Sequence, residues 1–253
     1  MSEEPRESLT GRTFHGRSLR GSRFVECDLT DVVVRGSELA GLELDSAWLF
    51  EGGQLLVNGV DVVPLVDAEL NARFPGRELR GAADPVGMRT AWAAVEAAWA
   101  AVVQRATALP SGSVDVSVAG EWSFAQTLRH LVTATDCWLG KAVLEREQPF
   151  DPIGLPNDDG EGSAAFQHAE FTTSTPDFAD VLQVRAHRQG MVRDFLAEVT
   201  EANLAEQRRN PHAPAHEETV LSCLHTILEE EWEHHRYAVR DLDAPAAPDS
   251  GRG

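Results

Sequence analysis

The chain has 253 residues, of which 42% are hydrophobic and 25% are charged. That length fits one large domain or two unequal ones, and the composition excludes a wholly disordered protein. The formal charge of -19 predicts a surface that repels phosphate backbones and anionic lipid, so we expect neither nucleic acid nor membrane as a partner. The cysteines form no CxxC pair, and no apolar run approaches the roughly 18 residues of a membrane span. We therefore expect a protein of the reducing cytoplasm.

The first part of the chain repeats with a period of five residues. An apolar side chain stands at every fifth position: Leu9, Phe14, Leu19, Phe24, Leu29, Val34, Leu39, Leu44 and Leu49. This period matches neither the helix, at 3.6 residues per turn, nor the strand, at 2, so neither element keeps these side chains on one face. A coil that turns a corner every five residues does.

Residues 9 to about 50 resemble the pentapeptide-repeat family, and Cys27-Asp28-Leu29 matches the small-acidic-Leu centre of its repeat. Arg12 and Arg17 depart from the pattern, because the family has a small inward residue there. The resemblance implies a short right-handed β-helix with the central Leu or Phe pointing inward. We expect such a segment to be a structural cap or a surface on which another protein docks.

The segment after the repeats predicts a boundary near residue 80. Two apolar runs flank the turn signal Asn58-Gly59, and this hairpin would close the β-helix at residue 63. We expect a short helix and a linker over 64–80. Asp84 and Pro85 are suited to cap and start a new helix.

The second part predicts an all-α antiparallel four-helix bundle over residues 81–243, followed by a disordered tail over 244–253. Strong helix formers and apolar residues at helical spacing mark the elements. A capping-box pattern, Ser123 with Gln126, precedes the second of them. The loop over 147–174 is long enough to suggest a functional role. The predicted helices span 85–108, 123–145, a stretch that starts at 175 and includes Phe195, and 217–242.

The fourth helix carries the candidate chemistry. Glu231 and His235 fall within its apolar stripe, where an ionised carboxylate is costly unless it is paired or coordinated. One turn apart, they have the spacing with which a helix presents two ligands to one metal, although such a pair also merely stabilises helices. For Glu230 and His234 we expect a solvated charged face. His130 lies on the flank of the second helix's stripe, not at its centre.

Two motifs stand at the second and fourth predicted helices: Glu121-Trp122-Ser123 with Leu128-Arg129-His130-Leu131, and Glu230-Glu231-Trp232-Glu233-His234-His235-Arg236-Tyr237 with Arg240-Asp241-Leu242. They resemble the DinB-like four-helix bundles, which include mycothiol-dependent maleylpyruvate isomerases and thiol S-transferases. The resemblance spans 81 to about 243. It implies that His130, Glu231 and His235 bind one divalent metal, with zinc as the first expectation and nickel, iron or manganese as alternatives.

The function implied is a metal-dependent transferase or isomerase that activates a low-molecular-weight thiol such as mycothiol. Its small electrophilic substrate would lie near Trp138 and Trp232, and Arg188 would help to recognise an anionic group. A hydrolase using metal-bound water and a non-catalytic metal or small-molecule binder, docked to a protein through the β-helix, are the alternatives. For His212 we favour surface exposure, with a loop metal site as the alternative. A homodimer is compatible with this organisation.

Overall fold

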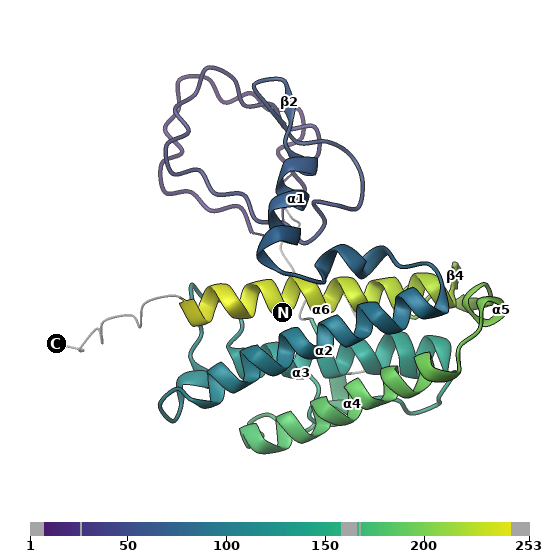
Figure 1. Cartoon of the computed structure of the whole chain (residues 1–253). Coiled ribbons are helices and arrows are strands. Elements are labelled where there is room, and N and C mark those ends of the chain that lie inside the picture. Colours follow the sequence, from purple (N-terminus) through teal and green to yellow (C-terminus); the bar gives the residue numbers. More distant parts are fainter. Residues whose placement is uncertain (1–7, 26, 158–165, 167, 244–253) are drawn as a thin grey trace. The chain divides into compact units, whose positions relative to one another are not determined.

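The computed structural model describes residues 8–25, 27–157, 166 and 168–243 (Figure 1). The chain divides into two compact units, residues 1–45 and 46–253, which are described separately. The predicted tail over 244–253 and residues 158–165 of the long loop lie outside the described residues.

The first unit is a coil that turns with the period of the sequence. Positive φ angles recur every five residues, and the backbone hydrogen bonds that close its turns recur every ten, as in Arg12 N to Leu9 O and Ser22 N to Leu19 O. No strand occurs among the described residues of this unit, and its central apolar side chains are 44 to 60% exposed. The expected β-helix with a buried interior is therefore not what the structure shows. The positive-φ residues are Gly11, Gly16, Gly21, Asp31, Gly36 and Gly41.

The second unit begins with the predicted hairpin. Strands β1 (Leu56–Val57) and β2 (Val60–Asp61) pair antiparallel. Asn58 and Gly59 between them both adopt positive φ, at 50° and 82°, which a two-residue hairpin turn of this type requires. Helix α1 (Val63–Arg73) and a 3-10 helix (Arg77–Gly81) then lead to the bundle, so the predicted linker is largely helical.

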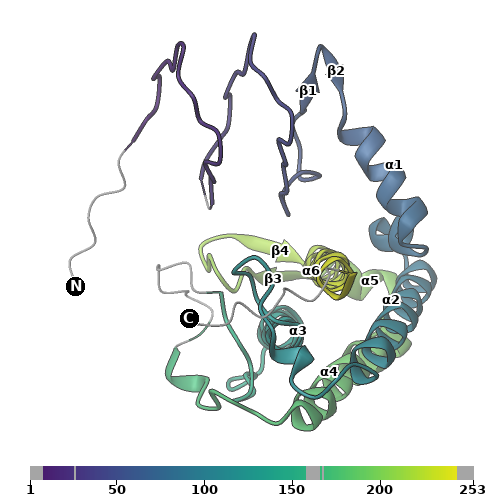
Figure 2. The same ribbon diagram turned by 90° about the vertical axis from the view of Figure 1, so that its left-hand side faces the viewer.

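Four helices form the core of the second unit (Figures 1 and 2). Asp84 caps α2 by accepting from the amides of Val86 and Gly87, and Ser123 and Gln126 form the predicted capping box of α3. Helices α2 and α3 each pack against both α4 and α6, which makes a closed ring around one apolar core. The helices are α2 (Pro85–Thr107), α3 (Phe124–Thr135), α4 (Phe178–Glu198) and α6 (Val220–Asp243).

Smaller elements fill the connections. Helix α3 continues as a π-helical stretch (Asp136–Val143), a rare geometry that is often found at functional sites. A short helix α5 (Glu201–Leu204) precedes strands β3 (Gln207–Arg209) and β4 (Glu217–Thr219), which pair antiparallel ahead of α6. Single 3-10 turns lie at Ser113–Asp115 and His168–Glu170. No helix in the described part of the chain is both long enough and apolar enough to cross a membrane.

Candidate metal site

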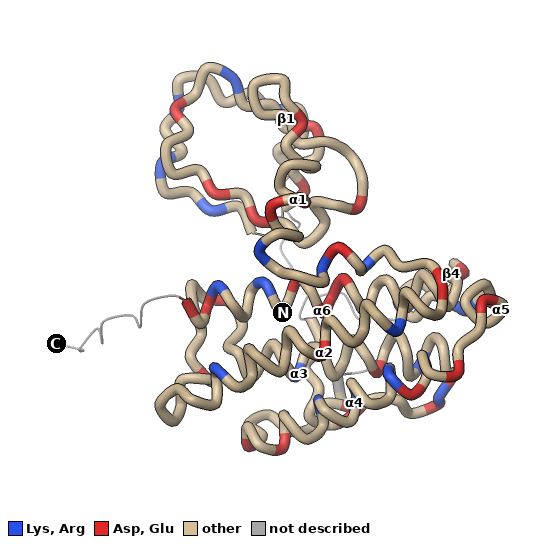
Figure 3. Tube along the Cα trace, in the orientation of Figure 1, with Lys and Arg blue, Asp and Glu red and all other residues tan. Residues whose placement is uncertain are grey.

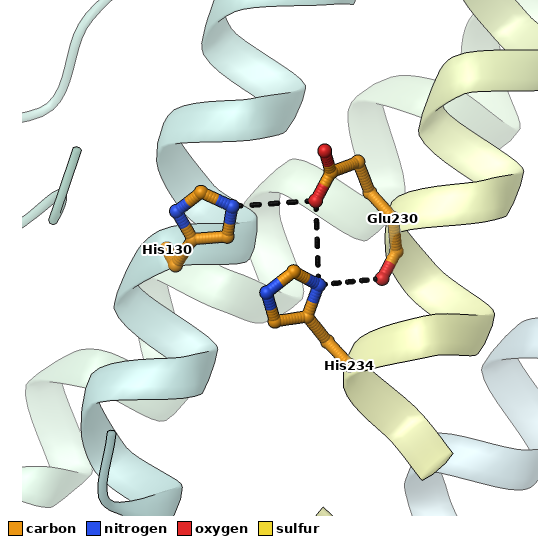
Figure 4. A group of neighbouring side chains, drawn as sticks. All are labelled: His130, Glu230 and His234. Atoms are coloured by element: carbon orange, nitrogen blue, oxygen red, sulfur yellow. Dashed lines mark hydrogen bonds and ion pairs between the residues drawn. The ribbon is translucent and has the colours of Figure 1, made fainter. Parts of the chain in front are cut away.

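Helices α3 and α6 bring three metal-ligating side chains together: His130, Glu230 and His234 (Figure 4). One ligand atom from each lies within 4.8 Å of the others. Glu230 Oε2 lies 3.3 Å from His130 Nε2 and 3.3 Å from His234 Nδ1. Glu230 and His234 are one turn apart on α6, so a single helix face presents both to His130.

The ring of His130 is fixed by a contact on its far side. Its Nδ1 lies 3.2 Å from the carbonyl oxygen of Leu155. A carbonyl only accepts, so Nδ1 carries a proton and donates it there, and Nε2 is the atom left to face the carboxylate of Glu230. A lone pair and a carboxylate oxygen repel each other unless a proton or a metal cation lies between them. His130 Nε2 and the Glu230 carboxylate are therefore oriented to hold a divalent cation, whereas His234 Nδ1 also lies 2.9 Å from the backbone carbonyl of Glu230 and would have to release that contact to bind one (Figure 4).

The electrostatics of the site favour an ionised Glu230 carboxylate beside a neutral His234 imidazole. Burial alone would raise the pKa of the Glu230 carboxyl, but the hydrogen bond and charge of His130, together with His234, lower it to about 2. Burial and the neighbouring charge of His130 lower the pKa of His234 to about 4. Near neutral pH, these values leave Glu230 charged and His234 uncharged, which are the protonation states that metal ligands need.

Stacked aromatic rings hold the two imidazoles in place. The ring centroids of His130 and His234 lie 4.6 Å apart at an interplanar angle of 29°. Trp122 covers the pair, with its centroid 4.7 Å from that of His130 and 6.1 Å from that of His234. Trp122 stands just before the capping box of α3, so the predicted motif contributes a wall of the site rather than a ligand.

Glu231 does not join His130 in the structure. Its side chain is 1% exposed, lies in the bundle core and forms a two-pronged ion pair with Arg185 of α4. Burial raises the pKa of the Glu231 carboxyl, and the Arg185 charge opposes this shift. The apolar stripe correctly indicated that Glu231 is buried and needs a partner, but that partner is an arginine.

His235 is also directed into the core. Its ring meets Phe74, Trp99 and Trp232 edge-on, at centroid distances of 5.6, 5.3 and 5.6 Å. Burial lowers its pKa, so the imidazole stays neutral among these rings. The geometry therefore moves the ligand pair by one residue from the predicted Glu231 and His235, because adjacent helix residues point about 100° apart.

The residues predicted to bind substrate have different surroundings. Trp138 lines a cavity beside the ligands. Trp232 is 2% exposed and packs in the core near Gly76. Arg188 is 8% exposed and bonds to two carboxylates, Asp136 at 2.6 Å and Asp151 at 3.3 Å, so its charge is already compensated.

A small cavity of about 60 Å³ adjoins the ligands. It follows α3 past Ala134 to Cys137, which lies two turns and about 10 Å beyond His130. At that end Cys137 Sγ contacts His212 Nε2 at 3.4 Å, and burial raises the pKa of the thiol to about 12. His212 is exposed, as expected, and it also lines this cavity. The other lining residues are His130, Thr133, Trp138, Pro156, Asn157, Phe166 and Glu230.

Sequence reasoning did not select Glu230 and His234 as ligands, and it did not foresee that the exposed His212 lines the cavity beside them. The flank position of His130 on its helix was a usable signal, because a ligand on one flank is met by ligands on the flank of the facing helix. Glu230 and His234 flank the stripe of α6 in the same way. No comparable signal marks His212, since it lies in the loop between β3 and β4 and only the fold brings it to α3.

Comparison with known proteins gives one family. The sequence model of the DinB superfamily matches residues 64–238 of this chain. Searches of curated proteins and of solved structures found no match. The matched region begins at α1, includes all three clustered ligands and ends within α6. It covers well over half of the 253 residues, and the chain belongs to the DinB superfamily.

Proposed function

We propose that the protein is a divalent-metal-dependent thiol transferase or isomerase in which His130, Glu230 and His234 hold the metal. The observation that carries this proposal is a cluster of two histidines and one carboxylate, two of whose members, His130 and Glu230, line a cavity. Two histidines and one glutamate leave a coordination position open on zinc, as catalytic sites require. Nickel, iron and manganese also suit such ligands.

A bound divalent cation would supply Lewis acidity that lowers the pKa of a thiol and so favours its nucleophilic thiolate form. His130 and His234 would bind the cation as neutral imidazoles, and Glu230 would offset part of its charge. Trp122 would pack over one side of the two ligating imidazoles. The cavity along α3 is the side on which substrates would approach.

We propose that a low-molecular-weight thiol such as mycothiol is the co-substrate and that an electrophile occupies the cavity near Trp138. Trp138 and Phe166 supply aromatic walls, while Thr133 and Asn157 supply polar groups. Arg188 is not part of this proposal, because Asp136 and Asp151 already compensate its charge.

The hydrolase alternative is less well supported. Hydrolysis by metal-bound water commonly needs a nearby carboxylate as a general base. Glu230 is itself one of the three clustered ligands, and Glu233 is paired with Arg236 at 2.9 Å. A non-catalytic metal-binding protein remains the rival class. It would bind the metal without converting any thiol.

We also propose, for the first unit, a pentapeptide-repeat coil that docks another protein. The support is the recurrence of turns every five residues and a row of exposed apolar side chains. We further propose that the protein is cytoplasmic and that it forms a homodimer.

Elemental analysis tests the metal site, and the overlapping Glu and His pairs provide matched controls. His130→Ala, Glu230→Ala and His234→Ala should each lose the bound metal. His235→Ala should retain it, although that variant removes a side chain of similar size one position away. Retention by His234→Ala with loss in His235→Ala would overturn the ligand assignment.

Cobalt-loaded protein tests the thiol. A small thiol such as 2-mercaptoethanol should generate a sulfur-to-cobalt charge-transfer band in the wild type, and His234→Ala should not show it. Stoichiometric metal without such a band would contradict thiol activation and favour the non-catalytic alternative.

A further inference from the structure

The loop that meets His130 is tied to α3 by one arginine. Arg129, the residue before His130, is 8% exposed and donates to four backbone carbonyls. Its Nε reaches Ile153 O at 2.8 Å, and its Nη2 reaches Gly154 O at 3.5 Å and Thr173 O at 2.8 Å. Its Nη1 reaches Ser174 O at 3.1 Å. One guanidinium thus joins both ends of the long loop.

The backbone of Arg129 completes the connection. Its carbonyl oxygen accepts from Leu155 N at 3.2 Å, and Leu155 O in turn accepts from His130 Nδ1 at 3.2 Å. The two loop segments are also joined directly, because Thr173 N donates to Pro152 O at 3.1 Å. Arg129 therefore positions the Leu155 carbonyl, which orients His130, through both its own backbone carbonyl and its side chain.

The loop lies against α3 so closely that only glycine fits at position 154. A Cβ on Gly154 would lie 2.5 Å from Thr133 Oγ1 and 2.8 Å from a ring carbon of Phe171. Thr133 is one turn beyond Arg129 on the same helix. Two neighbouring turns of α3 thus fix where Leu155 presents its carbonyl.

We infer that Arg129 is a positioning residue for the metal site: by holding the 152–155 loop, it fixes the tautomer of His130 that leaves Nε2 to bind a cation. Lysine cannot replace it, because a single ammonium does not span carbonyls on two loop segments, whereas the planar guanidinium does. Contacts of this kind to the far nitrogen of a ligating histidine typically change metal affinity 10- to 100-fold. The inference rests on the proposed metal site.

The first test measures the tautomer of His130 in the metal-free protein by ¹⁵N NMR of the imidazoles, assigned with His130→Gln. We expect Nδ1 to carry a proton in the wild type, whether or not Nε2 also carries one toward Glu230, and to lose that proton in Arg129→Lys. An Nε2–H form with an unprotonated Nδ1 in the wild type, or an unchanged tautomer in folded Arg129→Lys, overturns the inference. This readout needs no metal, so it stands even where the proposed function fails.

The second test measures zinc affinity by competition with a chelating dye. Arg129→Lys should bind about 10- to 100-fold more weakly than the wild type. The matched control is Arg89→Lys, since Arg89 also donates to a backbone carbonyl, Leu196 O at 3.1 Å, but on another part of the bundle. Gly154→Ala provides a second route, because its Cβ forces the loop from α3, and it should weaken zinc binding while Arg129 is intact. Wild-type affinity in both variants, with retained helical far-UV signals, contradicts the inference.

Discussion

Glu230 and Glu231 are neighbours on α6, yet their surroundings differ completely. Glu230 faces two imidazoles at the edge of a cavity, whereas Glu231 is sealed in the core against Arg185. The same contrast holds for His234 and His235 one turn later. Which carboxylate can bind a cation is thus decided by the partner on the facing helix, not by residue type.

Removing the core carboxylate should affect stability and spare the metal. Glu231→Ala leaves the Arg185 guanidinium buried without its counter-charge, and breaking such a pair costs about 3 to 5 kcal/mol. Urea unfolding should show that loss, while elemental analysis should show wild-type metal content. Loss of metal with little change in unfolding free energy would mean that Glu231 is a ligand after all.

The site should make the metal-free protein sensitive to acid. His234 has its pKa lowered from 6.5 to about 4, so the unfolded chain binds this proton more readily and stability falls as the pH drops from 6.5 toward 4. Glu230, lowered from 4.5 to about 2, extends the loss below pH 4.5. Thermal unfolding should show that His234→Gln flattens the profile between pH 6.5 and 4. Parallel profiles for wild type and variant would rule out this contribution.

At the scale of elements, the sequence predicted the bundle well and the site only in part. Caps and helical spacing gave both ends of α2, the start of α3 and the end of α6 to within about one residue, because Asp84, Ser123 and the apolar stripes act locally. The predicted second helix continues beyond α3 as the π-helical stretch, and the first residues predicted for the fourth helix form β4. The stripe of α6 also marked Glu231 as buried. It could not show Arg185 opposite, because a helical wheel contains no information about the neighbouring helix.

The remaining differences have similar causes. The π-helical stretch after Thr135 packs against α6 and β3, and β4 packs against α6, so these elements are supported by tertiary contacts that local propensity does not reveal. In the first unit, the period of five gave the turns correctly. The buried interior expected from the resemblance is absent among the described residues, because the short coil leaves its apolar side chains exposed.

The cap of α3 should contribute measurably to the helix that carries His130. The Ser123 hydroxyl accepts from the backbone amide of Gln126, and the Gln126 side-chain oxygen accepts from the backbone amide of Ser123. Ser123→Ala should lower the free energy of unfolding by about 0.5 to 2 kcal/mol. Urea denaturation measures this, with the exposed Ser22→Ala as a control that should be neutral. An unchanged midpoint for Ser123→Ala would contradict a stabilising cap.

At the scale of the whole molecule, most of the net negative charge lies in the second unit, about in proportion to its length. Residues 1–45 contain nine acidic and six basic residues, and residues 46–253 contain the other 32 acidic and 16 basic ones. Figure 3 shows acidic positions along the helices of the bundle. A field of this sign raises the local concentration of cations around the unit that holds the ligands.

The second unit should be self-sufficient. It contains the entire buried core and all three clustered ligands. A chain starting at Ser46 should therefore fold cooperatively and bind the same amount of metal as the full chain, as judged by far-UV dichroism and elemental analysis. A truncated chain that is unfolded or metal-free would show that the first unit contributes to the bundle.

The two overlapping Glu and His pairs of α6 have a consequence for aligning the sequences of relatives. In a sequence alignment, a gap misplaced by one position aligns Glu230 with Glu231 and His234 with His235 without any mismatch. The role of ligand is then assigned to the wrong residues. Arg185 offers a way to resolve this. In a relative, an arginine on α4 that faces α6 identifies the glutamate that is paired in the core. The glutamate one position before it is then the candidate metal ligand.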